Sequence, residues 1–122
     1  MPPAVRALRG ATTIDEDTRE QVFERVIALL TEMFERNGID HDDVISILFT
    51  ATDDIHSAFP ATAARELGLG DVPLICAREL DIEGGTPRCI RVMAHLTTEK
   101  SPSELRHVYL QGAQSLRDDL PS

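Results

Sequence analysis

The sequence predicts an α/β protein in which one five-stranded mixed sheet carries two helices on one of its faces. Three observations lead to this fold class. Five short segments show the alternation or the apolar run of a strand, two segments show helical spacing, and 122 residues suffice for one domain with a single core. The domain is expected to span residues 1–122, in the order strand, helix, strand, helix and then three strands.

The first predicted strand, at 4–12, is followed by the longer helix. In AVRALRGAT the alternation places Arg9 on one face together with small apolar residues. Thr18, followed three positions later by Gln21, has the pattern of a capping box and predicts the start of the helix. Apolar residues then recur at helical spacing until Gly38, which predicts its end.

The remaining elements are shorter. The uninterrupted apolar run at 44–49 predicts a strand that is buried on both faces. Pro60 opens a short helix, and Gly68 follows its end. Three further strands are predicted at 74–77, 88–97 and 107–110.

One face of this sheet is expected to need a cover from another molecule. Two helices cannot shield both sides of five strands, and the segment around Arg91 is too apolar to lie free in water. We therefore predict self-association through the sheet, in a closed ring.

Composition excludes several classes of partner. Twelve basic against 21 acidic residues give a formal charge of −9, which argues against nucleic acid or an anionic membrane as the main partner. No apolar run approaches a membrane span, the N-terminus lacks a signal peptide, and two cysteines fit a reducing cytoplasm. The four histidines and the glycine pairs show no metal or dinucleotide spacing, so we expect neither a metal nor a cofactor.

An anionic small molecule remains a suitable ligand if basic residues gather locally against the overall charge. The candidates for chemistry are three arginines, an acid at a strand end, a cysteine and the only tyrosine: Arg9, Arg65, Arg91, Glu79, Cys76 and Tyr109. For each of them, a solvated, core or interface role is the commoner one. Single residues therefore do not identify a site.

Five segments together resemble one family, the small homotrimeric chorismate mutases of the AroH class. They are LRGATT (8–13), ATDDIHSAFPATAAREL (51–67), VPLICARELD (72–81), GGTPRCIRVM (84–93) and RHVYLQGAQSLRDDL (106–120). The resemblance implies a trimer that forms a pseudo-α/β-barrel, with active sites between subunits. It also implies the Claisen rearrangement of chorismate to prephenate, a step of phenylalanine and tyrosine biosynthesis that needs no cofactor.

The resemblance also implies roles for residues. Arg9 and Arg91 look like contacts to the substrate carboxylates and ether oxygen, Glu79 and Cys76 like partners of the ring hydroxyl and the reacting region. Further substrate contacts are implied at Tyr109, Leu74, Ile75, Ala77, Arg78, Phe59, Ala61, Thr62, Arg65, Leu116 and Arg117. Thr62 stands where some relatives carry Lys, so a basic residue is missing there.

Two alternatives stay open at this point. The trimeric imine deaminases have a similar fold and also carry a Pro-Arg pair before a strand, here Pro87-Arg88. They leave Arg9, Cys76 with Glu79, and Tyr109 unexplained. The chain could also be a non-catalytic module that binds an anionic metabolite.

Overall fold

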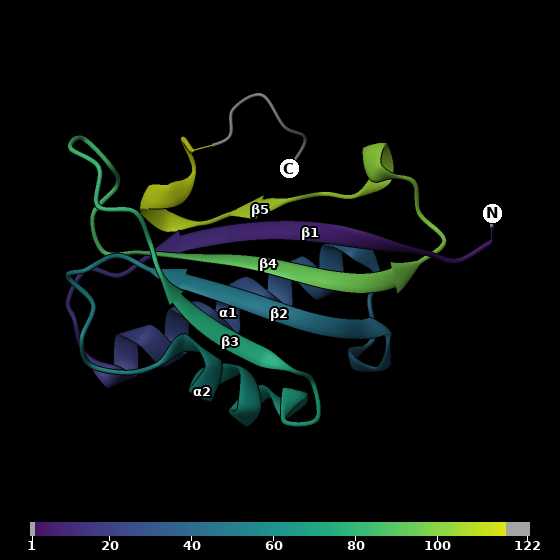
Figure 1. Cartoon of the computed structure of the whole chain (residues 1–122), viewed down its shortest axis with the longest axis horizontal. Coiled ribbons are helices and arrows are strands. Elements are labelled where there is room, and N and C mark those ends of the chain that lie inside the picture. The colour runs from purple at the N-terminus through teal and green to yellow at the C-terminus, as the bar shows by residue number, and fades with distance from the viewer. Residues whose placement is uncertain (1, 117–122) are drawn as a thin grey trace.

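The computed structural model describes residues 2–116, and its strands form one mixed sheet in the order β3-β2-β4-β1-β5. The strands are β1 (Ala4–Thr13), β2 (Val44–Ala51), β3 (Leu74–Arg78), β4 (Cys89–Thr98) and β5 (Val108–Tyr109). β4 is antiparallel to β1 and to β2, whereas β3 is parallel to β2 and β5 is parallel to β1 (Figure 1). The predicted mixed sheet and the predicted order of elements are confirmed.

The longer helix is α1 (Arg19–Asn37), and its ends follow the signals in the sequence. The Thr18 side chain accepts a hydrogen bond from the backbone N–H of Gln21 at 3.2 Å, and Gly38 adopts a left-handed conformation with φ 62°. The reciprocal half of the capping box is not formed, because the Gln21 side chain accepts from the backbone N–H groups of Asp15 and Glu16 instead.

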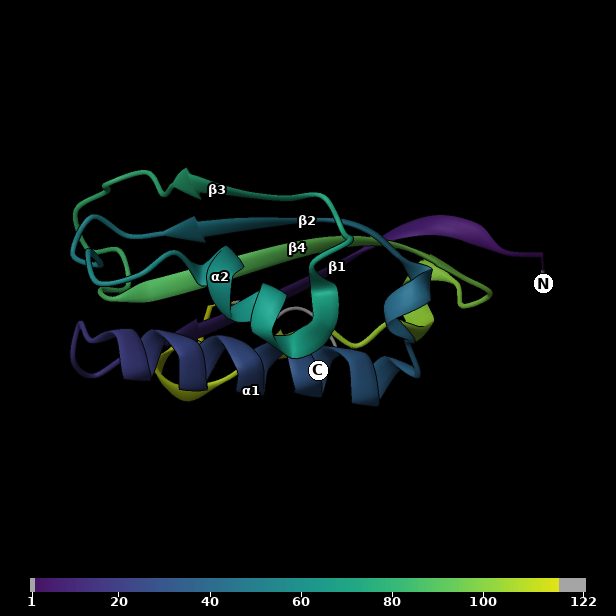
Figure 2. The ribbon, with the colours of Figure 1, turned by 90° about the horizontal axis from the view of Figure 1, so that it is seen from below.

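The shorter helix, α2 (Pro60–Ala64), has Pro60 at its start, as predicted, and continues through one π-helical turn at Arg65–Leu69. Gly68 has φ 100°, a conformation that strongly favours glycine, and the chain leaves the helix at this point. Both helices lie on the same side of the sheet, which confirms the predicted layering (Figure 2).

Strand parity separates a buried face of the sheet from an open one. In β4 the side chains of Ile90, Val92, Ala94 and Leu96 are at most 2% exposed and belong to the apolar core under the helices. Gly10 of β1 lies against α1 so closely that a Cβ atom there would come within 2.5 Å of Met33 Sδ. The core is therefore packed between the helices and this face alone.

The opposite face, which Figure 1 views from the front, carries no helix among residues 2–116. Ile75 is 63% exposed, while Leu48 and Met93 are half-buried. The prediction that β2 is buried on both faces is thus not met within one chain, because the helices cover only one face.

Candidate active site

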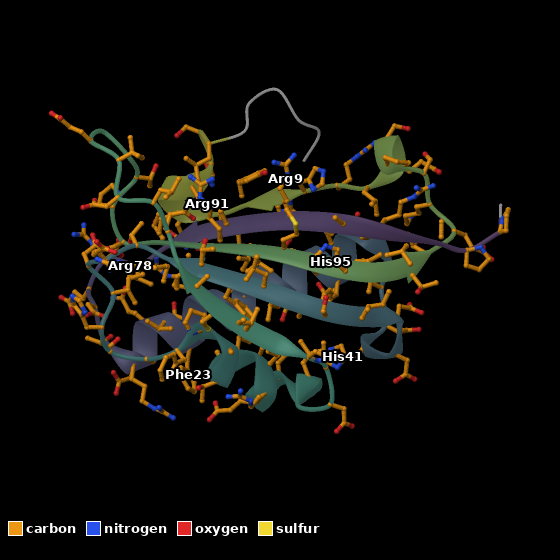
Figure 3. The ribbon with its side chains drawn as sticks, viewed as in Figure 1. Arg9, Phe23, His41, Arg78, Arg91 and His95 are labelled. Carbon is orange, nitrogen blue, oxygen red and sulfur yellow. The ribbon has the colours of Figure 1, made fainter. Side chains whose placement is uncertain are left out.

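Two arginines and one carboxylate gather on the open face of the sheet. In the β1–β4 register Ala11 pairs with Arg91 and Arg9 pairs with Met93, so both arginines project from the same face. Glu79, directly after β3, approaches Arg91 on the same face from the β3 edge of the sheet, with its Oε2 3.5 Å from Arg91 Nε. Figure 3 shows Arg9 and Arg91 over neighbouring strands. This local positive charge stands against the net negative charge of the chain.

Tyr109 completes the group from β5, where it pairs with Ala11 of β1. Its hydroxyl is buried and has no hydrogen-bond partner in the part of the chain that the structure describes. A buried polar group without a partner is rare in native proteins. Tyr109 borders the same hollow as the arginines.

The hollow between these side chains has a volume of about 230 Å³ and is lined by Arg9, Leu48, Thr50, Glu79, Arg91, Met93 and Tyr109, among others. Two guanidinium groups beside one carboxylate suit an anionic ligand, since each guanidinium can bind a carboxylate through two N–H groups. Ligand sites usually enclose about 300–1,000 Å³, so this hollow is smaller than the usual range.

A second group of predicted residues lies on the other side of the edge strand β3. Phe59, Thr62, Cys76 and Arg78 border a hollow of about 620 Å³ near the start of α2. Cys76 pairs with Phe49 of β2 and packs against the core on the helix-covered side. Cys76 and Glu79 therefore lie on opposite faces of the sheet within one chain, because an odd number of positions separates them along an extended segment.

The structure distributes the remaining predicted residues over both faces. Ile75 and Ala77 are exposed on the open face, and Leu74 packs against the core. Arg78 is paired with Asp53 through two hydrogen bonds of 2.6 and 2.8 Å, at the end of the sheet seen at the left of Figure 3.

Ala61 is 5% exposed and belongs to the core, whereas Arg65 is exposed at the end of α2. Leu116 is half-buried, and its backbone N–H donates to the carbonyl of Ala113. Arg117 lies outside the described residues.

Carboxylates hold the loop that leads to Phe59. Asp17 accepts hydrogen bonds from the backbone N–H groups of His56 at 2.8 Å and Ser57 at 3.1 Å. A hydrogen bond from the Ser57 side chain is the main cause that lowers the pKa of Asp17 below its usual value. The Asp54 carboxylate accepts from the backbone N–H of Arg88 and from the Thr52 hydroxyl. The half-buried Asp17 thus anchors the loop before Phe59, and the exposed Asp54 links Thr52 to Arg88.

A larger hollow, of about 650 Å³, lies at the far end of the sheet, but its charges do not suit an anion. Asp43, Glu99 and Glu104 line it, with Lys100 as a basic neighbour. Among residues 2–116 no group of three or more His, Cys, Asp and Glu side chains is placed to hold a metal ion. Within the same residues no helix has the length and apolar character needed to cross a membrane.

Comparison with known proteins identifies the family. The model of the family described as "Chorismate mutase type I" matches residues 5–120. This chain belongs to that family. The chorismate mutase AroH of Thermus thermophilus is 46% identical over 119 residues, covering 97% of this chain and 98% of the relative. The chorismate mutase AroH of Bacillus subtilis (strain 168) is 43% identical over 117 residues, covering 95% of this chain and 92% of the relative.

A solved structure supports the same assignment. The chorismate mutase from Clostridium thermocellum superposes with a TM-score of 0.88 at 46% sequence identity, covering 89% of this chain and 97% of that chain. The chorismate mutase family thus accounts for both the sheet and the sequence. Neither an imine deaminase nor a non-catalytic binding module is favoured.

Some residues that line the hollow between Arg9 and Arg91 of this chorismate mutase were not predicted from the sequence. Leu48 and Thr50 lie in β2, where nearly every residue is apolar, so the sequence does not distinguish the open face of this strand from the buried one. Alternation counted from the buried Ile47 would have assigned both residues to the open face. His107 was also missed. Its ring accepts a hydrogen bond from the backbone N–H of Arg9, a contact that no pattern in the sequence indicates.

Proposed function

We propose that the chain converts chorismate to prephenate, a step in the biosynthesis of phenylalanine and tyrosine, at the hollow formed by Arg9, Arg91, Glu79 and Tyr109. The observation that carries the proposal is this cluster of two arginines and one carboxylate on the open sheet face of a type I chorismate mutase. Chorismate carries two carboxylates, an ether oxygen and a ring hydroxyl, which match the charges and hydrogen-bonding groups of the cluster.

The rearrangement is unimolecular. One carbon–oxygen bond breaks, one carbon–carbon bond forms, and no atom enters or leaves, so the protein has to supply neither a nucleophile nor a proton. Its contribution is to hold the substrate in a folded conformer and to stabilise the negative charge that develops on the ether oxygen. We expect the reaction to proceed without a metal or a cofactor.

We assign roles by charge and position. Arg91 has a permanently charged planar fork that can donate to the ether oxygen and to a carboxylate together. Glu79 accepts from the ring hydroxyl, while Arg9 and the buried Tyr109 hydroxyl donate to carboxylates. Of these groups, Arg91 gains most in the transition state, because the charge that it meets exists only there.

We further propose that three copies close into a pseudo-α/β-barrel, with each active site between two subunits. The open sheet face exposes Ile75, and the hollow of about 230 Å³ is too small for an enclosed ligand, so a second copy would supply both a cover and a wall. The second group of residues, Phe59, Thr62, Cys76 and Arg78, lies across the edge strand β3 and would form that wall, together with the exposed Arg65 at the end of α2. Leu116 and Arg117 would close the site. We place the protein in the cytoplasm.

The decisive experiment is a chorismate turnover assay on the purified chain, with and without a chelator. We expect prephenate to form at the same rate in both cases, and a parent protein without turnover would contradict the proposal. Sedimentation should give three times the mass of one chain, and a monomer at micromolar concentration would contradict the trimer.

Mixed trimers test the interfacial site. Arg91→Ala and Phe59→Asp alter the two groups of residues separately, and Phe59 is 71% exposed in one chain, so its substitution should not prevent folding. Each variant alone should be strongly impaired. Unfolding and refolding them together should restore activity, because some interfaces then combine an intact Arg91 with an intact Phe59. A chain carrying both substitutions is the control, and mixtures no more active than this control would contradict shared sites.

A further inference from the structure

We propose that Thr50 is a positioning residue of this site, whose hydroxyl holds the Glu79 carboxylate away from Arg91. Thr50 Oγ1 donates to Glu79 Oε2 at 2.7 Å, and the same oxygen lies 3.5 Å from Arg91 Nε. The first distance is that of a strong hydrogen bond to a charged acceptor, while the second is longer than a charge-assisted bond, which measures about 2.7–2.9 Å. The carboxylate is therefore bound to the hydroxyl and only adjacent to the guanidinium.

The backbone gives Thr50 this position. Thr50 pairs with Arg91 in the β2–β4 register, and it pairs with Ala77 of β3 on its other side. The backbone N–H of Glu79 donates to the carbonyl of Ala51 at 3.0 Å and extends the β2–β3 ladder beyond the end of β3. This bond fixes the backbone of Glu79 but leaves its side chain free to rotate. The Thr50 hydroxyl is the group that selects one orientation.

The consequence concerns Arg91, whose side chain is 46% exposed beside a Glu79 side chain that is 26% exposed. Without the hydroxyl, Coulomb attraction would draw the carboxylate onto the guanidinium and form a direct ion pair. Such a pair would occupy the N–H groups that an anionic ligand requires. Thr50 thus keeps the fork of Arg91 available, and because it bonds Oε2, it leaves Glu79 Oε1 without a claim from this hydroxyl.

The expected effect of Thr50 on turnover rests on the proposed function, whereas its effect on the distance between Glu79 and Arg91 does not. Thr50→Val has nearly the same shape and lacks the hydroxyl, while Thr50→Ser keeps the hydroxyl and lacks the methyl group. In a ligand-free crystal structure of Thr50→Val we expect a Glu79 oxygen within about 3 Å of an Arg91 nitrogen. The Thr50→Ser structure should keep the present arrangement. A Glu79 side chain that stays in place in Thr50→Val would overturn the inference, whether or not the chain turns over chorismate.

Kinetics provide the second test. The free energy of a hydrogen bond to a charged group corresponds to a loss of about 10- to 100-fold in kcat/KM for Thr50→Val. We expect this loss mainly in kcat, because Arg91 acts in the transition state. Thr50→Ser should stay within about threefold of the parent. A Thr50→Val protein as fast as an active parent would overturn the inference and leave the proposed function intact.

A double-mutant cycle separates positioning from a general structural effect. If Thr50 acts through Glu79, Thr50→Val should cause no further loss in a Glu79→Ala background, since the carboxylate that it orients is gone. Fully additive losses would instead mean that Thr50 acts as a strand residue, and would overturn the inference. Melting temperatures of all four proteins should be recorded at one protein concentration, because stability of an oligomer depends on it.

Discussion

The ring of His107 accepts a hydrogen bond from the backbone N–H of Arg9, with 3.0 Å between the backbone nitrogen and Nδ1. This contact lies next to the Gly10–Val108 pair, where the parallel ladder between β1 and β5 begins. β5 pairs through two residues, Val108 and Tyr109, so the ring extends a short ladder that holds Tyr109 beside the arginines. Nδ1 accepts a hydrogen bond only when it carries no hydrogen itself.

We predict that His107→Ala lowers the free energy of unfolding by about 0.5–1.5 kcal/mol, as expected for one lost hydrogen bond. His107→Asn should retain most of this stability, because Asn Oδ1 can take the place of Nδ1. Urea unfolding at a fixed protein concentration measures both. Equal losses in the two variants would show that the acceptor atom is not what stabilises this strand.

The exposed guanidinium of Arg91 leads to a prediction about turnover. Arg91→Lys keeps the charge but loses the planar fork of the guanidinium, so we expect kcat to fall by about 100- to 1,000-fold with the protein still folded and its oligomeric state unchanged. Arg9→Ala should mainly raise KM, if Arg9 binds a carboxylate equally in the ground and transition states. Steady-state kinetics distinguish the two patterns. A fast, folded Arg91→Lys protein would reduce Arg91 to a structural strand residue.

Asp17 gives a prediction about pH. Hydrogen bonds from Ser57 and His56 lower the pKa of its carboxyl from the usual value of 3.8, so folding favours the ionised form. The stabilisation is therefore present above about pH 4 and is lost as the pH falls through the lowered pKa. We expect Asp17→Asn to cost about 1 kcal/mol at pH 7. The difference from the parent should shrink near pH 3. Chemical unfolding at both pH values tests this, and an equal difference at both would contradict it.

The buried thiol of Cys89 should be protected from labelling in the native protein. Cys89 is 2% exposed, and burial raises the pKa of its thiol, so little thiolate forms at pH 8. In a Cys76→Ala variant, which leaves Cys89 as the one thiol of the sequence, we expect no labelling of the native protein during a time in which the unfolded chain reacts completely. Rapid labelling of the native variant would mean that the end of β4 opens readily.

Much of the fold follows from local features of the sequence. Alternation in 88–97 placed Arg91 opposite Ile90 and Val92, and this assignment is confirmed because the side-chain period of a strand is two wherever the strand lies in a sheet. Thr18, Pro60 and the glycine after each helix predicted the helix ends, since each satisfies a backbone requirement at that position. The resemblance of five segments identified the family before any neighbour in space was known.

Only the tertiary structure decided which strands are neighbours. β4 lies between β1 and β2, and this order brings Arg91 next to Glu79 and Thr50, which come from other parts of the chain. Strand order results from burial of the helix-facing side chains over the whole sheet, a long-range energy that no local pattern contains. The sequence by itself therefore determined the elements and, in the alternating strand at 88–97, the face of each side chain, while the packing of distant strands determined the site.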